Sequence, residues 1–184
     1  MIYPVYIYGS PSLRKPSEDV AKDYPGLKEL AADMFETMYA SDGVGLAAPQ
    51  IGKNIRMVVM DASVYADDDP SLADFKKVLI NPEIYETSDH EVLMNEGCLS
   101  VPGIHEDVYR PETVRIRYLD ENFELHEEVF EGFPARIAQH ECDHLEGQLF
   151  TDKLSPLRKT LLTNKLSGMA KGKFKASYRT KQVK

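Results

Sequence analysis

Two histidines four residues apart constrain this sequence more than any other feature. They belong to the pattern His-Glu-x-x-His, formed by His140, Glu141 and His144. On an α-helix, residues i and i+4 lie on one face, so both imidazoles can reach a single metal ion. Glu141 follows the first histidine directly and can take a proton from a water at the open side of such a metal. The pattern therefore predicts a catalytic metal site on a helix.

Two histidines leave such a site one protein ligand short, since catalytic zinc-type centres use three. The best remaining candidate is Cys98, which follows Gly97. The other cysteine, Cys142, lies two residues from each histidine, roughly 200° around the helix, and is expected to face the core. Because the sequence shows no export signal, we do not expect a disulfide. The alternative is that each histidine is an ordinary surface or core residue and that Cys98 is a small buried hydrophobe.

The chain of 184 residues suits one domain. We expect a single catalytic domain over residues 1–170 and a basic, flexible tail over residues 171–184. Ten Lys or Arg residues and no acidic residue follow Asp152, although the chain as a whole carries a formal charge of −8. Such a segment favours a polyanionic partner such as the ribosome surface. The alternative is a solvated tail that folds against its own acidic body.

The hydropathy and the first residues of the sequence indicate in which cellular compartment to expect the protein. There is no apolar run near the ~20 residues that a membrane span needs. The first residues lack the basic stretch of a signal peptide and are interrupted by Pro4. We therefore expect a cytoplasmic protein that has no membrane partner, and we expect no DNA partner.

Periodicity predicts three helices and several short strands. Apolar residues at helical spacing predict a helix over residues 24–41, and a second over 133–146 carries both histidines on one face. Ser155 and Pro156 are a suitable N-cap and first turn for a third helix. Strands are expected at 55–61 and 78–80, with a hairpin formed by 113–119 and 124–130. The glycine-rich stretch 43–52 is either a tight buried connection or a loop whose backbone approaches a ligand.

Three motifs together resemble the signature of the peptide deformylases. They are residues 43–50 (GVGLAAPQ), 96–100 (EGCLS) and 139–144 (QHECDH), in the family's order and at similar spacing. The resemblance extends over about residues 1–160. It implies an α+β fold in which small mixed, mostly antiparallel sheets pack around a central metal-binding helix, with a C-terminal helix. It also implies removal of the N-formyl group from the initiator methionine of newly synthesised polypeptides.

The resemblance also implies the metal chemistry. Cys98, His140 and His144 hold the ion, a metal-bound hydroxide attacks the formyl carbon, and Glu141 serves as general base and then general acid. In the family the metal is Fe²⁺, and Ni²⁺, Co²⁺ or Zn²⁺ can occupy the site in purified protein. Ligand type alone would favour zinc for one cysteine and two histidines.

Further roles follow from the same resemblance. The Gln50 amide and the Leu99 backbone N–H stabilise the oxyanion. Arg136 stands where an apolar pocket residue is common, and its long stem can still line the pocket. From charge and position we also expect Glu96 to pair with Arg110 and brace the Cys98 loop. The expected substrate-binding residues are Gly45, Val44, Gly97, Phe133, Arg136 and Ile137.

Two rival functions fit parts of the pattern. Zinc peptidases share His-Glu-x-x-His, but many take a third ligand downstream of the helix, and no histidine follows His144. A non-catalytic, metal-stapled domain that binds RNA or the ribosome would close its site with a fourth protein ligand, for which the sequence offers no candidate.

Overall fold

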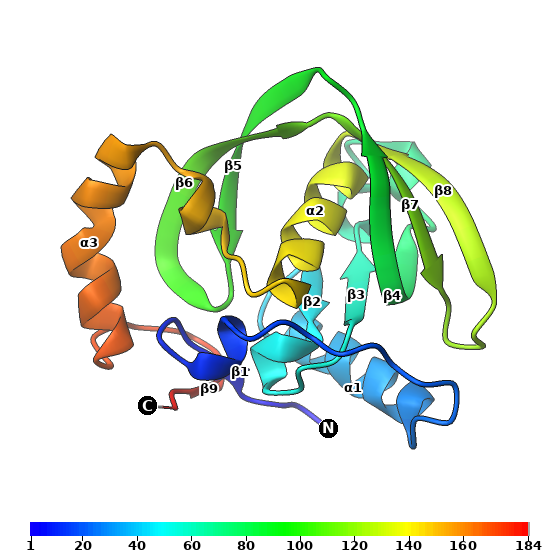
Figure 1. Cartoon of the computed structure of the whole chain (residues 1–184), viewed down its shortest axis with the longest axis horizontal. Coiled ribbons are helices and arrows are strands. Elements are labelled where there is room, and N and C mark those ends of the chain that lie inside the picture. Colours follow the sequence, from blue (N-terminus) through cyan, green and yellow to red (C-terminus); the bar gives the residue numbers. More distant parts are fainter. Residues whose placement is uncertain (184) are drawn as a thin grey trace.

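Helix α2 (Phe133–Leu145) runs through the middle of the molecule, between a five-stranded sheet and a long hairpin (Figure 1). The computed structural model describes residues 1–183. The sheet has the order β2-β3-β4-β7-β8 and is antiparallel throughout, β5 pairs with β6, and β1 pairs with β9 in parallel. The other helices are α1 (Leu27–Ala40) and α3 (Pro156–Ala170), and the strands are β1 (Val5–Tyr6), β2 (Gly45–Ala47), β3 (Met57–Asp61), β4 (Lys76–Thr87), β5 (Glu91–Cys98), β6 (Val101–Pro111), β7 (Thr113–Leu119), β8 (Leu125–Glu131) and β9 (Thr180–Lys181).

Strand β3 shows why the sheet lies between two helices. All five of its residues are buried, and successive side chains of a strand point to opposite faces. Met57 and Val59 pack with α1 residues, whereas Val58 and Met60 pack in the cluster that includes α2. The unbroken apolar run is thus that of a strand covered on both faces. The expected α+β fold, with mostly antiparallel sheets around a central helix, is confirmed.

The helix ends follow the local sequence. Helix α2 starts after Gly132, which has φ +65°, and has Pro134 in its first turn, where the missing N–H costs no hydrogen bond. Helix α3 starts at Ser155, whose hydroxyl accepts from Arg158 N at 3.3 Å, as the sequence predicts. The predicted hairpin 113–130 is present as β7 and β8. No helix in residues 1–183 combines the length and apolar character needed to cross a membrane.

Strand β4 is longer than predicted. We expected a strand over 78–80 that ends before Asn81-Pro82, but β4 continues to Thr87. Asn81 takes a left-handed conformation with φ +50°, and the pairing with β7 shifts register between Ile80 and Glu83. Proline lacks a backbone donor, and a register shift is where a strand tolerates it. The hairpin β5–β6, which carries Cys98, was not predicted.

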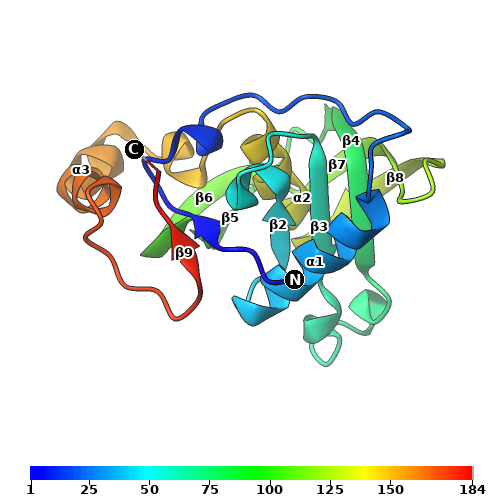
Figure 2. The same cartoon turned by 90° about the horizontal axis from the view of Figure 1, so that it is seen from below.

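The C-terminal segment is paired with the other end of the chain. We expected a flexible tail over residues 171–184; its described part, to Val183, lies back against the N-terminal strand (Figure 2). Val5 N donates to Arg179 O at 2.9 Å and Ile7 N donates to Lys181 O at 3.0 Å. Strand β1 offers backbone groups that need partners, and this pairing supplies them. Lys184 lies outside the described residues. We therefore propose one domain that includes this segment.

Candidate metal centre

Helix α2 and strand β5 bring the three predicted ligands together. His140 and His144 lie one turn apart on α2, and Cys98 is the last residue of β5. One donor atom from each residue lies within 4.8 Å of the others. The Cys98 Sγ is 3.4 Å from His144 Nε2. A thiol from a distant hairpin therefore meets two imidazoles from one helix turn, as expected.

These residues fit a divalent transition metal. Thiolate and imidazole are ligands for such ions, and three protein ligands leave one position open. Burial and the nearby charge of His140 lower the pKa of His144 well below its usual value, which favours the neutral, ligating form. For His140, burial acts the same way, but hydrogen bonds with Cys98 and Glu96 outweigh it and raise its pKa. A metal ion bound at His140 would need the neutral imidazole, so it would take the place of a proton there.

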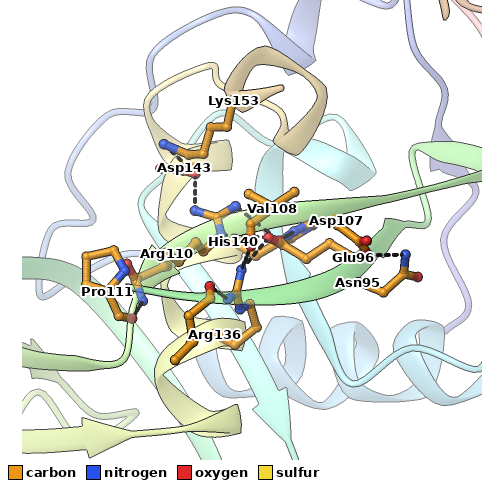
Figure 3. A network of polar contacts seen from close by, with 12 residues as sticks. Asn95, Glu96, Asp107, Val108, Arg110, Pro111, Arg136, His140, Asp143 and Lys153 are labelled. Atoms are coloured by element: carbon orange, nitrogen blue, oxygen red, sulfur yellow. Dashed lines mark hydrogen bonds and ion pairs between the residues drawn. The ribbon is translucent and has the colours of Figure 1, made fainter. Parts of the chain in front are cut away.

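A buried polar network holds the first histidine (Figure 3). His140 Nδ1 lies 2.7 Å from Glu96 Oε1, which leaves its Nε2 for the metal. Arg110 donates to Glu96 through Nε at 2.8 Å and Nη2 at 3.1 Å, and to Asp143 at 2.8 Å. The predicted pairing of Glu96 with Arg110 is therefore confirmed. Burial alone would raise the pKa of Glu96, but hydrogen bonds from His140 and Arg110 and the Arg110 charge lower it to about 2.

Glu141 lies beside the metal ligands in the wall of the pocket. Its side chain is buried, and Oε2 has no hydrogen-bond partner within residues 1–183. Burial raises the pKa of Glu141 to about 7, close to the value that suits proton exchange at neutral pH. Gly45 makes this position possible, because a Cβ there would lie 2.5 Å from Glu141 Oε1. Gly45, the first residue of β2, is thus required for the close approach of this backbone to the Glu141 carboxylate.

Gln50 and Leu99 approach the site from two loops. Gln50 lies in a short 3₁₀ helix (Ala48–Ile51), and its Oε1 accepts from Ala47 N at 2.9 Å. That bond orients the amide so that Nε2 lies 3.2 Å from Ser100 Oγ and 3.6 Å from Cys98 Sγ. Leu99 follows Cys98 in the turn between β5 and β6. The structure thus places a neutral amide donor directly beside the sulfur ligand.

Comparison with known proteins decides the family. The model of the polypeptide deformylase family matches residues 2–160. The chain belongs to the peptide deformylase family. A peptide deformylase of Christiangramia forsetii is 48% identical, over 97% of this chain and 95% of that protein. One of Cytophaga hutchinsonii is 49% identical, over 98% and 97%.

Solved deformylase structures show the same fold. A crystal structure of peptide deformylase from Plasmodium falciparum superposes with a TM-score of 0.82 at 38% identity, covering 91% of this chain and 95% of that one. A peptide deformylase from Legionella pneumophila gives a TM-score of 0.80 at 39% identity, covering 93% and 96%. This chain is accordingly a hydrolase of N-terminal processing, which removes the N-formyl group from nascent peptides.

The pocket of this deformylase has a volume of about 520 Å³ and opens beside the metal ligands and Glu141. Its lining includes all the predicted substrate-binding residues: Val44, Gly45, Gly97, Phe133, Arg136 and Ile137. It also includes a stretch that the sequence did not predict, Lys175 to Tyr178 of the C-terminal segment. No periodicity marks this stretch, and long-range contacts such as its pairing next to β1 bring it to the site.

Arg136 contributes less to the pocket than we expected. Its guanidinium turns inward, where it donates to Glu96 Oε2 at 3.0 Å and to the carbonyls of Val108 and Val92, each at 2.8 Å. It is buried, and its charge is matched by the carboxylate that also holds His140 (Figure 3). Arg136 therefore belongs mainly to the support of the metal ligand.

The remaining histidines do not join the three metal ligands. His90 and His105 are exposed, and His105 lines the outer part of the pocket. His126 lies near Glu124, and its Nε2 is 2.7 Å from Asp120 Oδ2. Asp120 also accepts the backbone N–H of Glu124 at 3.1 Å, so the group belongs to the β7–β8 turn. Cys142 packs against the apolar cluster of α2 and the sheet, as expected.

Proposed function

We propose that Cys98, His140 and His144 hold one Fe²⁺ per chain and that this ion serves the deformylase reaction. The proposal depends on one observation: three ligand atoms lie within 4.8 Å beside a buried carboxylate and a pocket. When bound, a divalent ion acidifies the attacking water and polarises the formyl oxygen. Ligand chemistry alone favours zinc, and the choice of iron comes from the family. We also place the protein in the cytoplasm, where nascent chains are made.

Glu141 moves the proton in this scheme. Its carboxylate accepts the proton of the attacking water and later delivers it to the departing amine of the peptide, a transfer commonly worth roughly 10²–10⁴ in rate. The buried site with a pKa of about 7 suits both directions of transfer. As the water attacks, and before the amine departs, negative charge develops on the former carbonyl oxygen, towards which the Gln50 amide and the Leu99 N–H donate. A carboxylate in place of Gln50 would repel that charge.

The pocket holds the formyl-methionyl end of the peptide. An apolar site for the methionine side chain is offered by Val44, Phe133 and Ile137. Phe133 packs edge-on against Tyr65, with ring centroids 4.9 Å apart. Backbone groups at Gly45 and Gly97 are placed to pair with an extended peptide, as an added strand would. Gly97 leaves no room for a side chain, since a Cβ would lie 2.6 Å from the His105 ring.

The variant Glu141→Gln tests the proposal. It should keep the metal content and the melting temperature of the wild type but lose at least about 10²-fold in kcat on formyl-Met-Ala. An unformylated peptide offered to the wild-type enzyme should remain intact. Full activity of the variant, or internal cleavage of the unformylated peptide, would contradict the assignment, the second in favour of a peptidase.

Metal identity has its own test. Enzyme prepared without oxygen should contain iron and lose activity in air, because a ferrous ion beside a thiolate is lost when either is oxidised. Nickel-substituted enzyme is the matched control and should stay active in air. Equal, air-stable activity of the iron and zinc forms would count against iron as the working metal.

We further propose that the basic segment after Asp152 contacts the ribosome surface. Helix α3 exposes Leu157 and Leu161 as well as basic side chains, so its outer face has both apolar and positive groups. The triple variant Lys159→Glu, Lys171→Glu and Lys173→Glu should lose salt-dependent co-sedimentation with ribosomes. Lys22→Glu, on an exposed loop of the acidic body, is the control. Co-sedimentation unchanged in the triple variant would remove this proposal.

A further inference from the structure

Tyr178, in the C-terminal segment, reaches the turn that carries the catalytic backbone. Its hydroxyl donates to the carbonyl oxygen of Leu99 at 2.7 Å. Burial raises the pKa of Tyr178 to about 12, so the hydroxyl is protonated at neutral pH and acts as the donor. The residue is half-buried and lines the pocket. A side chain remote in sequence therefore holds the residue next to the sulfur ligand.

The segment is fixed immediately after this contact. Directly after Tyr178, the Arg179 carbonyl accepts from Val5 N at 2.9 Å, and the Arg179 guanidinium donates to Ile2 O at 3.0 Å. Thr180 then pairs with Val5 as the first residue of β9. Figure 2 shows β9 and β1 side by side at the edge of the molecule. Tyr178 is therefore supported by the paired termini rather than by a free tail.

The neighbouring peptide groups of the turn are also held. Tyr8 N donates to Ser100 O at 2.8 Å, and Ser100 Oγ accepts from Gln50 Nε2 at 3.2 Å. The carbonyl and the N–H of Leu99 belong to two peptide units joined at one Cα, so only two dihedral angles separate their directions. A bond that fixes the carbonyl therefore restricts the direction in which the Leu99 N–H points.

We propose that Tyr178 is a positioning residue for deformylation: by holding the Leu99 carbonyl, it keeps the Leu99 N–H directed at the developing oxyanion. This inference rests on the proposed role of Leu99 as an oxyanion donor. It gives the C-terminal segment a function in the reaction, in addition to any contact it makes with the ribosome. The phenol acts through its hydrogen bond to Leu99, and it makes no hydrogen bond to Cys98, His140 or His144 within residues 1–183.

The variant Tyr178→Phe removes the donor and keeps the ring. With full-length, metal-loaded enzyme and formyl-Met-Ala, kcat per bound metal should fall about fivefold to tenfold, while KM changes less than twofold. The loss is smaller than the 10²–10³ typical for deleting an oxyanion donor, because Leu99 keeps its N–H and loses only its fixed direction. Tyr109→Phe, an exposed tyrosine of β6, is the control and should match the wild type.

Two results would overturn the proposal. One is a kcat per bound metal within twofold of the wild type. A variant that loses activity only because it holds less metal would give this result. The other is an effect confined to KM, which would make Tyr178 a binding residue. Glu141→Gln separates this inference from the proposed function: if Glu141→Gln is inactive and Tyr178→Phe is normal, only the positioning role fails.

Discussion

The two walls of the active-site pocket are built differently. On the α2 side, His140 is held by Glu96, which is held in turn by the guanidinium groups of Arg110 and Arg136. Glu96 and both arginines are buried. On the other side, the stretch that includes Tyr178 is exposed or half-buried and is anchored by a two-residue strand pair. One wall is fixed by several charge-assisted hydrogen bonds, and the other by a few bonds at an edge.

The two walls are held differently because they have different functions. A metal ligand that moves loses the ion, so the imidazole needs an orienting partner that is itself hydrogen-bonded. The C-terminal wall carries no metal ligand, and segments that bind ligands are drawn from regions of low local stability. We therefore expect substitutions in the α2 wall to cost stability and metal, and changes in the C-terminal wall to cost mainly turnover.

The largest effect is expected for Glu96→Ala. It leaves Arg110 and Arg136 buried without their shared carboxylate, and such uncompensated charges typically cost about 3–5 kcal/mol in the free energy of unfolding. Metal content should fall as well, because His140 loses its orienting partner. Urea denaturation and metal analysis measure both, with Glu86→Ala, from an exposed pair with Arg115, as a control expected to cost less than about 1 kcal/mol. A stable, metal-loaded Glu96→Ala protein would show that the network is dispensable.

Acid should destabilise the α2 wall of the wild-type protein, without any substitution. The folded pKa of Glu96 is about 2, below its ordinary 4.5, so its stabilisation is fully present above pH 4.5 and is lost as the pH falls towards 2. A shift of this size corresponds to on the order of 3 kcal/mol. Denaturation of the wild type and Glu96→Gln across this window measures it. Equal pH dependence in the two proteins would contradict the assignment of this loss to Glu96.

Arg110→Ala should cost less than Glu96→Ala. Glu96 keeps Arg136 as a partner, whereas Asp143 loses its bond from Arg110, so we expect a loss of about 2 kcal/mol. Metal affinity should fall with it, because the brace on the Cys98 strand is weakened. If the melting temperature and the metal affinity both stay at wild-type values, the bracing role of Arg110 is wrong.

The smallest stability effect is expected for a truncation after Lys175. It removes the β1–β9 pair, the Tyr178 bond and the side-chain bonds of Arg179 and Gln182, which join no buried charged groups and which water can replace, so the free energy of unfolding should fall by only about 1 kcal/mol. The kcat should fall at least as far as in Tyr178→Phe. A stability loss as large as that of Glu96→Ala would contradict the inference that the α2 wall contributes more to stability than the C-terminal wall.

The sequence predicts the α2 wall well because its signals are local. Helical spacing predicts the helix over 133–146 and aligns His140 with His144. The pairing of Glu96 with Arg110 was expected from charge and from the family position of the two residues. The inward turn of Arg136 was missed, since the carbonyls of Val92 and Val108 that accept from it are set by the β5–β6 pairing. Tyr178 was missed for a similar reason: the basic segment has no apolar period, and its place depends on contacts with the other end of the chain.

The most direct test of the metal site uses cobalt as a probe. The account predicts that the enzyme binds one Co²⁺ per chain and shows an absorption band for charge transfer from a thiolate to the metal. Cys98→Ser should lose that band, whereas Cys142→Ser should keep it, because Cys142 packs in the core. A band that survives Cys98→Ser, or wild-type enzyme that binds Co²⁺ without such a band, would contradict the assignment of Cys98, His140 and His144 as the metal ligands.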